Sequence, residues 1–184
     1  MSKPGYGKIK GSAFEREVCR DLSRFVDPKS SDTLFWRSAM SGGRATLQHR
    51  KNVSKLCKDL NQKLIKNTTQ VGDITCVHKD GHWLTQVFYI EVKFYKDLDL
   101  ASSLLFGKGK LAKFWRETVE KANEVEREPL LVARQNRTDA LVVFSPSGLV
   151  KFRSFGYAPS VIMTSSPLSL TASARVCLYR EVFK

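Results

Sequence analysis

The order of predicted elements indicates an α/β domain, with helices on both faces of a mixed central sheet. A helical pattern over residues 14–25 is followed by strand-like runs, and a second helical pattern over residues 111–125 precedes two apolar runs. Hydrophobic residues make up 42% of the chain, which is enough for a substantial core. The length of 184 residues predicts one domain spanning residues 1–184.

The N-terminal segment is predicted to be an arm followed by a helix. Residues 1–11 are polar, basic and contain glycine, so we expect them to form a mobile arm. From Ser12, apolar side chains recur at helical spacing, at Phe14, Val18, Leu22 and Phe25. Pro28 and the serines after it are expected to end this helix.

Residues 71–93 are predicted to form a β-hairpin around which the chain is organised. Residues 73–77 form a short strand-like run, and residues 79–82 have the composition of a turn, with Gly81 able to adopt positive φ. Residues 83–93 are rich in aromatic and β-branched side chains, which are typical of a strand.

Two carboxylates and an ammonium are expected to share one face of this hairpin. Side chains alternate along a strand, so Glu91 and Lys93 point to one face, and a neighbouring strand can bring Asp73 beside them. Two buried carboxylates without a cation between them are costly, and their oxygens suit a hard divalent metal. The alternative is an ordinary amphipathic hairpin with a solvated charged face.

Glu15 has two interpretations. Ser12 and Glu15 have the spacing of a capping box, in which the glutamate bonds back to the amide of the cap residue. Alternatively, Glu15 lies at the border of the buried helix face and is an acid directed at the metal site.

Residues 44–70 are predicted to be a basic insertion. They contain seven Lys or Arg residues and one acid, and part of the segment has the apolar spacing of an amphipathic helix. One interpretation is a solvated helical face, and the other, which the charge favours, is a clamp on the DNA backbone. The candidate DNA contacts are Arg44, Arg50, Lys51, Lys55 and Lys58.

The second half of the chain is predicted to supply a helix and two buried strands. The helix covers residues 111–125, and the strands cover residues 130–133 and 140–144. In the tail, residues 151–155 alternate like a strand, and residues 176–183 have the composition of another.

The net charge of +13 predicts a polyanionic partner, most simply nucleic acid. No apolar run is long enough to span a bilayer, and the N-terminal residues have no apolar signal-peptide core, so we expect a cytoplasmic protein without a membrane partner. The four cysteines form no C-x-x-C pair and are expected to be reduced thiols.

Three blocks resemble a known nuclease family. The pattern of Asp73 followed by Glu91-Val92-Lys93 is the signature of the PD-(D/E)XK nuclease superfamily, although Gly72 stands where the motif name has proline. With KGSAFEREV at residues 10–18 and WRSAMSGG at residues 36–43, the chain resembles archaeal-type Holliday junction resolvases. The insertion at 44–70 departs from that family, which passes from the serine loop to the aspartate within a few residues.

This resemblance implies a restriction-endonuclease-like fold and a metal-dependent endodeoxyribonuclease that cuts four-way DNA junctions as a homodimer. It implies that Asp73, Glu91 and the main-chain carbonyl of Val92 hold Mg²⁺, for which Mn²⁺ substitutes. Lys93 would orient the attacking water or stabilise the charge that develops on the phosphate. The same resemblance implies that Glu15 assists a second metal or its water, while Arg37 and Ser41 contact the phosphodiester.

Two alternatives stand beside junction resolution. The first is another endonuclease of the same fold, of the repair, restriction or mismatch type. The second is a non-catalytic nucleic-acid-binding protein, against which the joint presence of Glu15, Asp73, Glu91 and Lys93 argues.

Overall fold

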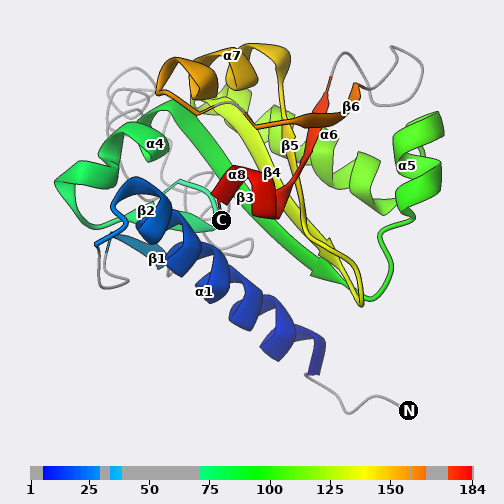
Figure 1. The fold of residues 1–184 in the computed structure, drawn as a ribbon. Helices are drawn as coiled ribbons and strands as arrows, with labels where there is room; N and C mark the ends of the chain where they lie inside the picture. Colours follow the sequence, from blue (N-terminus) through cyan, green and yellow to red (C-terminus); the bar gives the residue numbers. More distant parts are fainter. Residues whose placement is uncertain (1–5, 30–33, 39–70, 158, 165–173, 184) are drawn as a thin grey trace, which may run out of the picture.

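The computed structural model describes residues 6–29, 34–38, 71–157, 159–164 and 174–183. In this part of the chain a five-stranded sheet lies between two layers of helices, as Figure 1 shows. This layering confirms the predicted α/β class and is that of the restriction-endonuclease-like fold. No helix in the described ranges has both the length and the apolar character needed to cross a membrane.

The central sheet is mixed. Its strand order is β3-β4-β5-β7-β6, where β3 pairs parallel with β4 and the other pairs are antiparallel. The strand bounds are β3 Phe88–Tyr95, β4 Glu128–Gln135, β5 Leu141–Phe144, β6 Val161–Thr164 and β7 Arg175–Leu178. β4 and β5 confirm the two strands predicted near residues 130–133 and 140–144.

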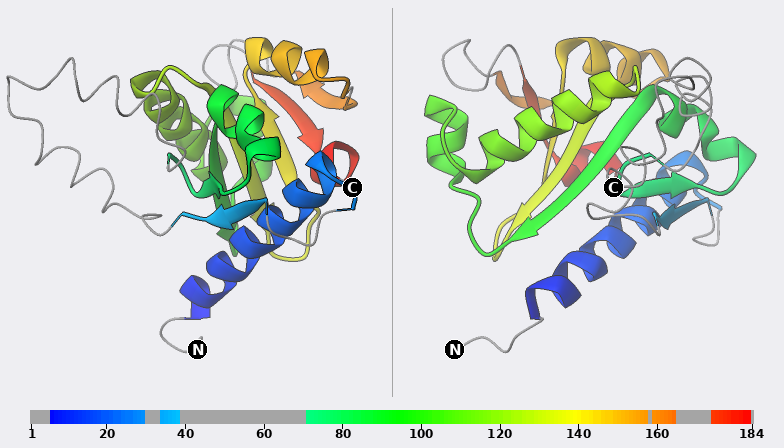
Figure 2. Two further views of the ribbon diagram at one scale, coloured as in Figure 1. Left: turned by 90° about the vertical axis from the view of Figure 1, so that its left-hand side faces the viewer. Right: turned by 180° about the vertical axis from the view of Figure 1, so that it is seen from behind.

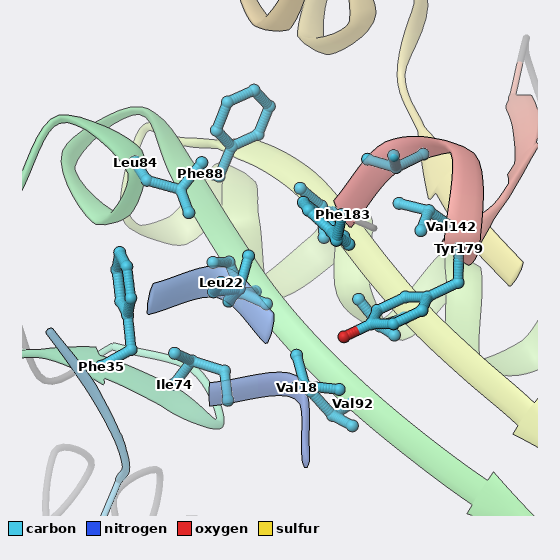
Figure 3. Close-up of a cluster of buried hydrophobic side chains, with 14 of the residues drawn as sticks. Val18, Leu22, Phe35, Ile74, Leu84, Phe88, Val92, Val142, Tyr179 and Phe183 are labelled. Carbon is cyan, nitrogen blue, oxygen red and sulfur yellow. The ribbon is translucent and has the colours of Figure 1, made fainter. Parts of the chain in front are cut away.

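One face of the sheet is covered by helices from the N-terminal, middle and C-terminal parts of the chain. The helices are α1 Tyr6–Val26, α4 His82–Val87, α7 Pro146–Ser154 and α8 Tyr179–Phe183. Figure 3 shows side chains from α1, α4 and α8 meeting those of β3 and β5, among them Leu22, Leu84, Phe183 and Val142. Because strand side chains alternate, Ile90 and Val92 point into this core.

The opposite face is covered by α6 Lys110–Glu124, with α5 Leu100–Phe106 beside it. Figure 2 shows α6 lying across the back of β3 and β4. Leu111, Ala112 and Trp115 of α6 pack against Leu131 and Ala133 of β4 in a second core. α6 confirms the helix predicted at 111–125.

Polar contacts fasten α1 to the rest of the fold. Arg134 on β4 makes a bidentate ion pair with Glu17, at 2.8 and 2.9 Å, and its guanidinium lies 4.4 Å from the centre of the Phe14 ring. The buried Tyr179 hydroxyl donates to Asp21 at 3.0 Å. These contacts fix the helix that carries Glu15 relative to the sheet.

The predicted hairpin at 71–93 is wrong. Residues 82–87 form the helix α4, so the strand begins only at Phe88, and a 3₁₀ turn at Lys79–Gly81 precedes α4. β2 (Ile74–Cys76) pairs antiparallel with β1 (Phe35–Arg37) instead of with β3. The apolar residues among 83–87 reflect packing of a helix on the core, because Leu84 is fully buried in it and Trp83 and Val87 pack against it.

The predicted mobile arm at 1–11 is wrong for residues 6–11, which belong to α1, and residues 1–5 lie outside the described part of the chain. Ser12 therefore lies inside the helix and cannot be its N-cap, so the capping-box interpretation of Glu15 is wrong.

The predicted strand at 151–155 is also wrong, because these residues belong mainly to α7, where Ser145 caps the helix by accepting from the Gly148 amide. Residues 176–183 divide between β7 and α8.

Candidate active site

Asp73 is positioned where the short β1–β2 ribbon meets the edge of β3. Gly72 forms a parallel bridge to Ile90, and the Asp73 amide donates to the Ile90 carbonyl at 2.9 Å. On its other side, the Asp73 carbonyl accepts from the Ser38 amide at 2.9 Å. Asp73 is therefore tied both to β3 and to the segment that continues β1 beyond Arg37.

Gly72 makes this close approach possible. Its φ is +87°, in the region that favours glycine, and a Cβ atom there would lie 2.5 Å from the Ile90 carbonyl oxygen. No side chain fits between these two backbones. The glycine that stands in place of the motif's proline therefore has a structural reason in this chain.

The Asp73 carboxylate reaches across to β3. Its Oδ2 accepts from the Val92 amide at 2.8 Å and lies 3.7 Å from the Lys93 ammonium. Because the N–H and C=O of one strand residue point to the same edge, the Val92 carbonyl also faces the edge where Asp73 lies. Two oxygen donors, one carboxylate and one carbonyl, thus converge beside Glu91.

Glu91 is held by three side chains. Its Oε1 accepts from Lys93 at 2.5 Å and from Lys121 on α6 at 3.1 Å, and its Oε2 accepts from the Tyr89 hydroxyl at 2.9 Å. Asp73 is 6% and Glu91 5% exposed, so both carboxylates are buried. Glu91 and Lys93 share a face of β3, as the alternation predicts.

The electrostatics of the two carboxylates differ. Burial, together with the nearby Glu91 charge, raises the pKa of Asp73 to about 6. Burial would also raise the pKa of Glu91, but the ammonium groups of Lys93 and Lys121 outweigh it, so that pKa is lowered. Burial would lower the pKa of Lys93, but Asp73 and Glu91 overcome this and raise it. The site therefore holds one firmly ionised carboxylate and one that readily takes a proton.

Glu15 and Arg37 lie together at the border of this site. The Arg37 Nε donates to a carboxylate oxygen of Glu15, which joins α1 to β1. The Glu15 charge contributes, as a minor cause, to the raised pKa of Asp73. The structure thus places both predicted residues near Asp73 and pairs them with each other.

Several predicted residues fall outside the described part of the chain. They are Ser41, Arg44, Arg50, Lys51, Lys55 and Lys58, together with the rest of the insertion at 44–70. Their assignments stay predictions.

Sequence reasoning missed Tyr89 and Lys121. Tyr89 precedes Glu91 by two residues, so strand alternation alone could have placed both side chains on one face. Lys121 is 30 positions away from Glu91 along the chain and reaches it only because α6 packs on β3. No local pattern identifies such a contact.

The donor set fits a divalent cation. Asp73 and Glu91 supply carboxylate oxygens, and Val92 supplies a carbonyl, which are the ligands that hard cations prefer. Burial and, after it, repulsion from Glu91 raise the pKa of Asp73, and a cation between the two carboxylates would relieve that repulsion. Among the described residues no group of three or more His, Cys, Asp or Glu side chains is arranged to hold a metal. The protein's own ligands would thus be these two carboxylates and the carbonyl, with water or phosphate completing the shell.

Comparison with protein families gives a match that includes this site. Residues 6–160 match the model of the family described as "Phage putative PDDEXK endonuclease". This range covers α1, both strands of the β1–β2 ribbon, β3, α6 and the two strands after it. Comparison with curated proteins and with solved structures gave no significant match.

Proposed function

We propose, because this chain belongs to that PDDEXK endonuclease family, that it hydrolyses DNA phosphodiester bonds at the site formed by Asp73, Glu91 and Lys93. The observation that carries the proposal is the Lys93 ammonium, which lies 2.5 Å from Glu91 and 3.7 Å from Asp73. The signature residues, which come from two separate segments of the sequence, thus enclose one small volume.

Each side chain has a distinct role in the proposed reaction. A divalent cation, when bound, supplies Lewis-acid activation of the phosphate and of the attacking water. Asp73, Glu91 and the Val92 carbonyl would hold that cation. Lys93 would orient the water or stabilise the charge that develops on the phosphate.

Other side chains would keep Glu91 in place during the reaction. Tyr89 and Lys121 each donate to this carboxylate and fix its orientation. Their contacts leave Glu91 little freedom to rotate, as a preorganised ligand requires.

We predict that Asp73→Asn and Glu91→Gln each abolish cleavage while DNA binding survives. Either change removes an anionic ligand without adding repulsion to phosphate. The measurement is cleavage of DNA with and without a divalent cation, beside affinity for the same DNA in EDTA.

Asp139→Asn and Glu181→Gln are matched controls, because both side chains are exposed and both residues are distant in sequence from those of the site. Cleavage at the wild-type rate by either site variant would contradict the assignment. Binding without cleavage by the wild-type protein under all divalent ions would favour the non-catalytic alternative.

The finer proposal is a Mg²⁺-dependent enzyme, with Mn²⁺ substituting, that resolves four-way junctions as a two-fold dimer. It is supported by the contact between Glu15 and Arg37, which joins the two sequence blocks that carry the resolvase resemblance. One chain presents one such site, so paired cuts in opposed strands require two subunits.

Cleavage of a synthetic four-way junction beside its linear arms tests this finer proposal. Symmetric paired cuts in the junction with uncut arms would support it. Equal cutting of both would instead favour an endonuclease of the repair or restriction type.

A further inference from the structure

Trp36 is an exposed aromatic side chain next to the candidate active site. Its neighbours Phe35 and Arg37 turn inward, one into the core and the other onto Glu15 of α1. Trp36 stands between them in β1 and is 60% exposed. An indole exposed to this degree gains little from packing and is available to a ligand.

Trp36 borders a cavity of about 460 Å³ between α1 and β1. The cavity is lined by Arg16, Cys19, Arg20, Phe35, Trp36 and Arg37. Cys19 and Phe35 are buried and form an apolar floor, and the other four bring an indole and three guanidinium groups. This combination of aromatic face and positive charge matches a nucleotide, which has a base and a phosphate.

Two of these arginines have no acidic partner in the part of the chain that the structure describes. Arg16 and Arg20 lie one helical turn apart on α1, and both are exposed. Within the described residues neither forms an ion pair, whereas Arg37 pairs with Glu15. Like charges at this spacing disfavour a helix slightly, so the pair is better explained by an anionic ligand than by helix stability.

The cavity is close to the candidate catalytic groups. Ser38 follows β1, two positions after Trp36, and its amide donates to the Asp73 carbonyl. Two residues of a strand span about 7 Å, so Trp36 lies roughly one nucleotide's length from that point. A DNA strand with its phosphate at Asp73 could therefore place a neighbouring base on Trp36.

We propose that this cavity binds an unpaired nucleotide of the DNA strand next to the cut, with its base stacked on Trp36 and the flanking phosphates on Arg16 and Arg20. The inference rests on the proposed function in taking DNA as the substrate, and it narrows the substrate class. Bases in an intact duplex are stacked on each other, so Trp36 would recognise DNA that is branched, frayed or single-stranded near the cut.

Binding measurements in EDTA test whether the cavity binds an unpaired nucleotide, without cleavage of the DNA. The probes are a blunt duplex, the same duplex with a single-stranded thymidine tail, and the same duplex with an abasic tail of equal length. The two tails carry the same phosphates and differ only in their bases. We expect the wild-type protein to prefer the thymidine tail to the abasic tail.

The Trp36→Ala variant should lose roughly 5- to 150-fold in affinity for the thymidine tail, the range of one base–aromatic stack. Its affinity for the abasic tail and the blunt duplex should stay within about twofold of wild type. Trp36→Phe keeps a ring and should retain most of the preference. Phe106→Ala, which removes another exposed aromatic side chain, is the matched control.

The contribution of Arg16 and Arg20 is tested by removing their positive charges. Arg16→Gln/Arg20→Gln should weaken binding to both tails and flatten the salt dependence, by about 0.7 in log–log slope for each phosphate that is no longer neutralised. Arg153→Gln/Arg180→Gln removes the same charge from exposed positions elsewhere and should leave the slope closer to wild type.

A Trp36→Ala variant that keeps the base preference, or an arginine pair that behaves like its control, would overturn the inference. A melting curve confirms that each variant is folded. A protein that shows the preference but cleaves no DNA with any divalent ion would refute the endonuclease proposal alone. A protein that cleaves DNA without the preference would refute only the role of Trp36.

Discussion

Two ammonium groups donate to a single oxygen of the buried Glu91. Lys93 belongs to the sequence signature, whereas Lys121 comes from α6 and is 37% exposed at its side chain. Because Lys93 also lies near Asp73, Lys121 is the cation dedicated to Glu91. We infer that Lys121 is a positioning residue that holds Glu91 in place when Lys93 engages the substrate.

Lys121→Met is expected to lower kcat roughly tenfold, because Glu91 loses one charge-assisted hydrogen bond that fixes its orientation. DNA affinity should change little, and Lys121→Arg should restore most of the activity. Lys113→Met, an exposed lysine on the same helix, is the control. An unchanged kcat in Lys121→Met, or an equal loss in Lys113→Met, would show that Lys121 has no positioning role.

The ionised form of Asp73 is unfavourable in the folded protein. Its folded-state pKa is raised from 3.8 to about 6 by burial and by Glu91. The folded state therefore binds more protons than the unfolded state between about pH 4 and 6, so stability falls as the pH rises through this window.

Asp73→Asn should therefore make the metal-free protein more stable at pH 7, by up to about 3 kcal/mol, with little gain at pH 4. The asparagine carbonyl can still accept from the Val92 amide, so the local bond is kept. Urea unfolding in EDTA at both pH values measures this. A gain that is equal at both pH values would show that ionisation of Asp73 is not the cause.

At the scale of elements, the site depends on how the β1–β2 ribbon joins the sheet. The ribbon meets β3 through the Gly72–Ile90 bridge and the Asp73–Ile90 hydrogen bond. On its other side the ribbon packs against α1, which carries Glu15. A change at this junction should therefore move Asp73 relative to Glu91 and Lys93.

Gly72→Ala should destabilise the protein by more than about 2 kcal/mol and abolish cleavage, because its Cβ would overlap the Ile90 carbonyl. Gly156→Ala is a matched control, with φ of +93° but open space around the added Cβ. The control should cost only the conformational strain of about 1 kcal/mol. Equal losses of stability in the two variants would show that the close approach to Ile90 is unimportant.

At the scale of the whole molecule, positive charge exceeds negative charge by 13. Several of the described acids pair with cationic groups, among them Glu17, Glu91 and Glu128. The excess of positive charge is therefore available to DNA phosphates, and the sequence concentrates part of it at 44–70.

Replacing Arg50, Lys51, Lys55 and Lys58 with Gln is expected to weaken DNA binding and flatten its salt dependence, by about 0.9 in log–log slope for each phosphate that these side chains neutralise. At low salt and saturating protein, cleavage should recover. A variant with Lys96, Lys108, Lys113 and Arg116 changed to Gln removes the same charge from described, exposed positions. If both variants flatten the slope equally, the insertion is not a dedicated clamp.

The sequence alone determined which residues are candidates for the site and several of the elements that surround them. Asp73, Glu91 and Lys93 could be chosen because they match the Asp, Glu-x-Lys signature and because residues two apart in a strand share a face. The helix α6 and the strands β4 and β5 could be predicted because local hydrophobic periodicity follows directly from which side is buried.

The tertiary structure decided how these residues meet. The apolar residues at 83, 84 and 87 suit a strand or a helix, and in the structure these residues form the helix α4, with Leu84 packed in the core. Residues 71–93 therefore do not form the predicted hairpin. Instead, Gly72 meets β3 through a parallel bridge to Ile90. Tyr89, Lys121 and the pairing of Glu15 with Arg37 were not assigned from the sequence. For Lys121 and the Glu15–Arg37 pair the reason is physical, because contacts between distant segments depend on packing, which local sequence patterns do not encode.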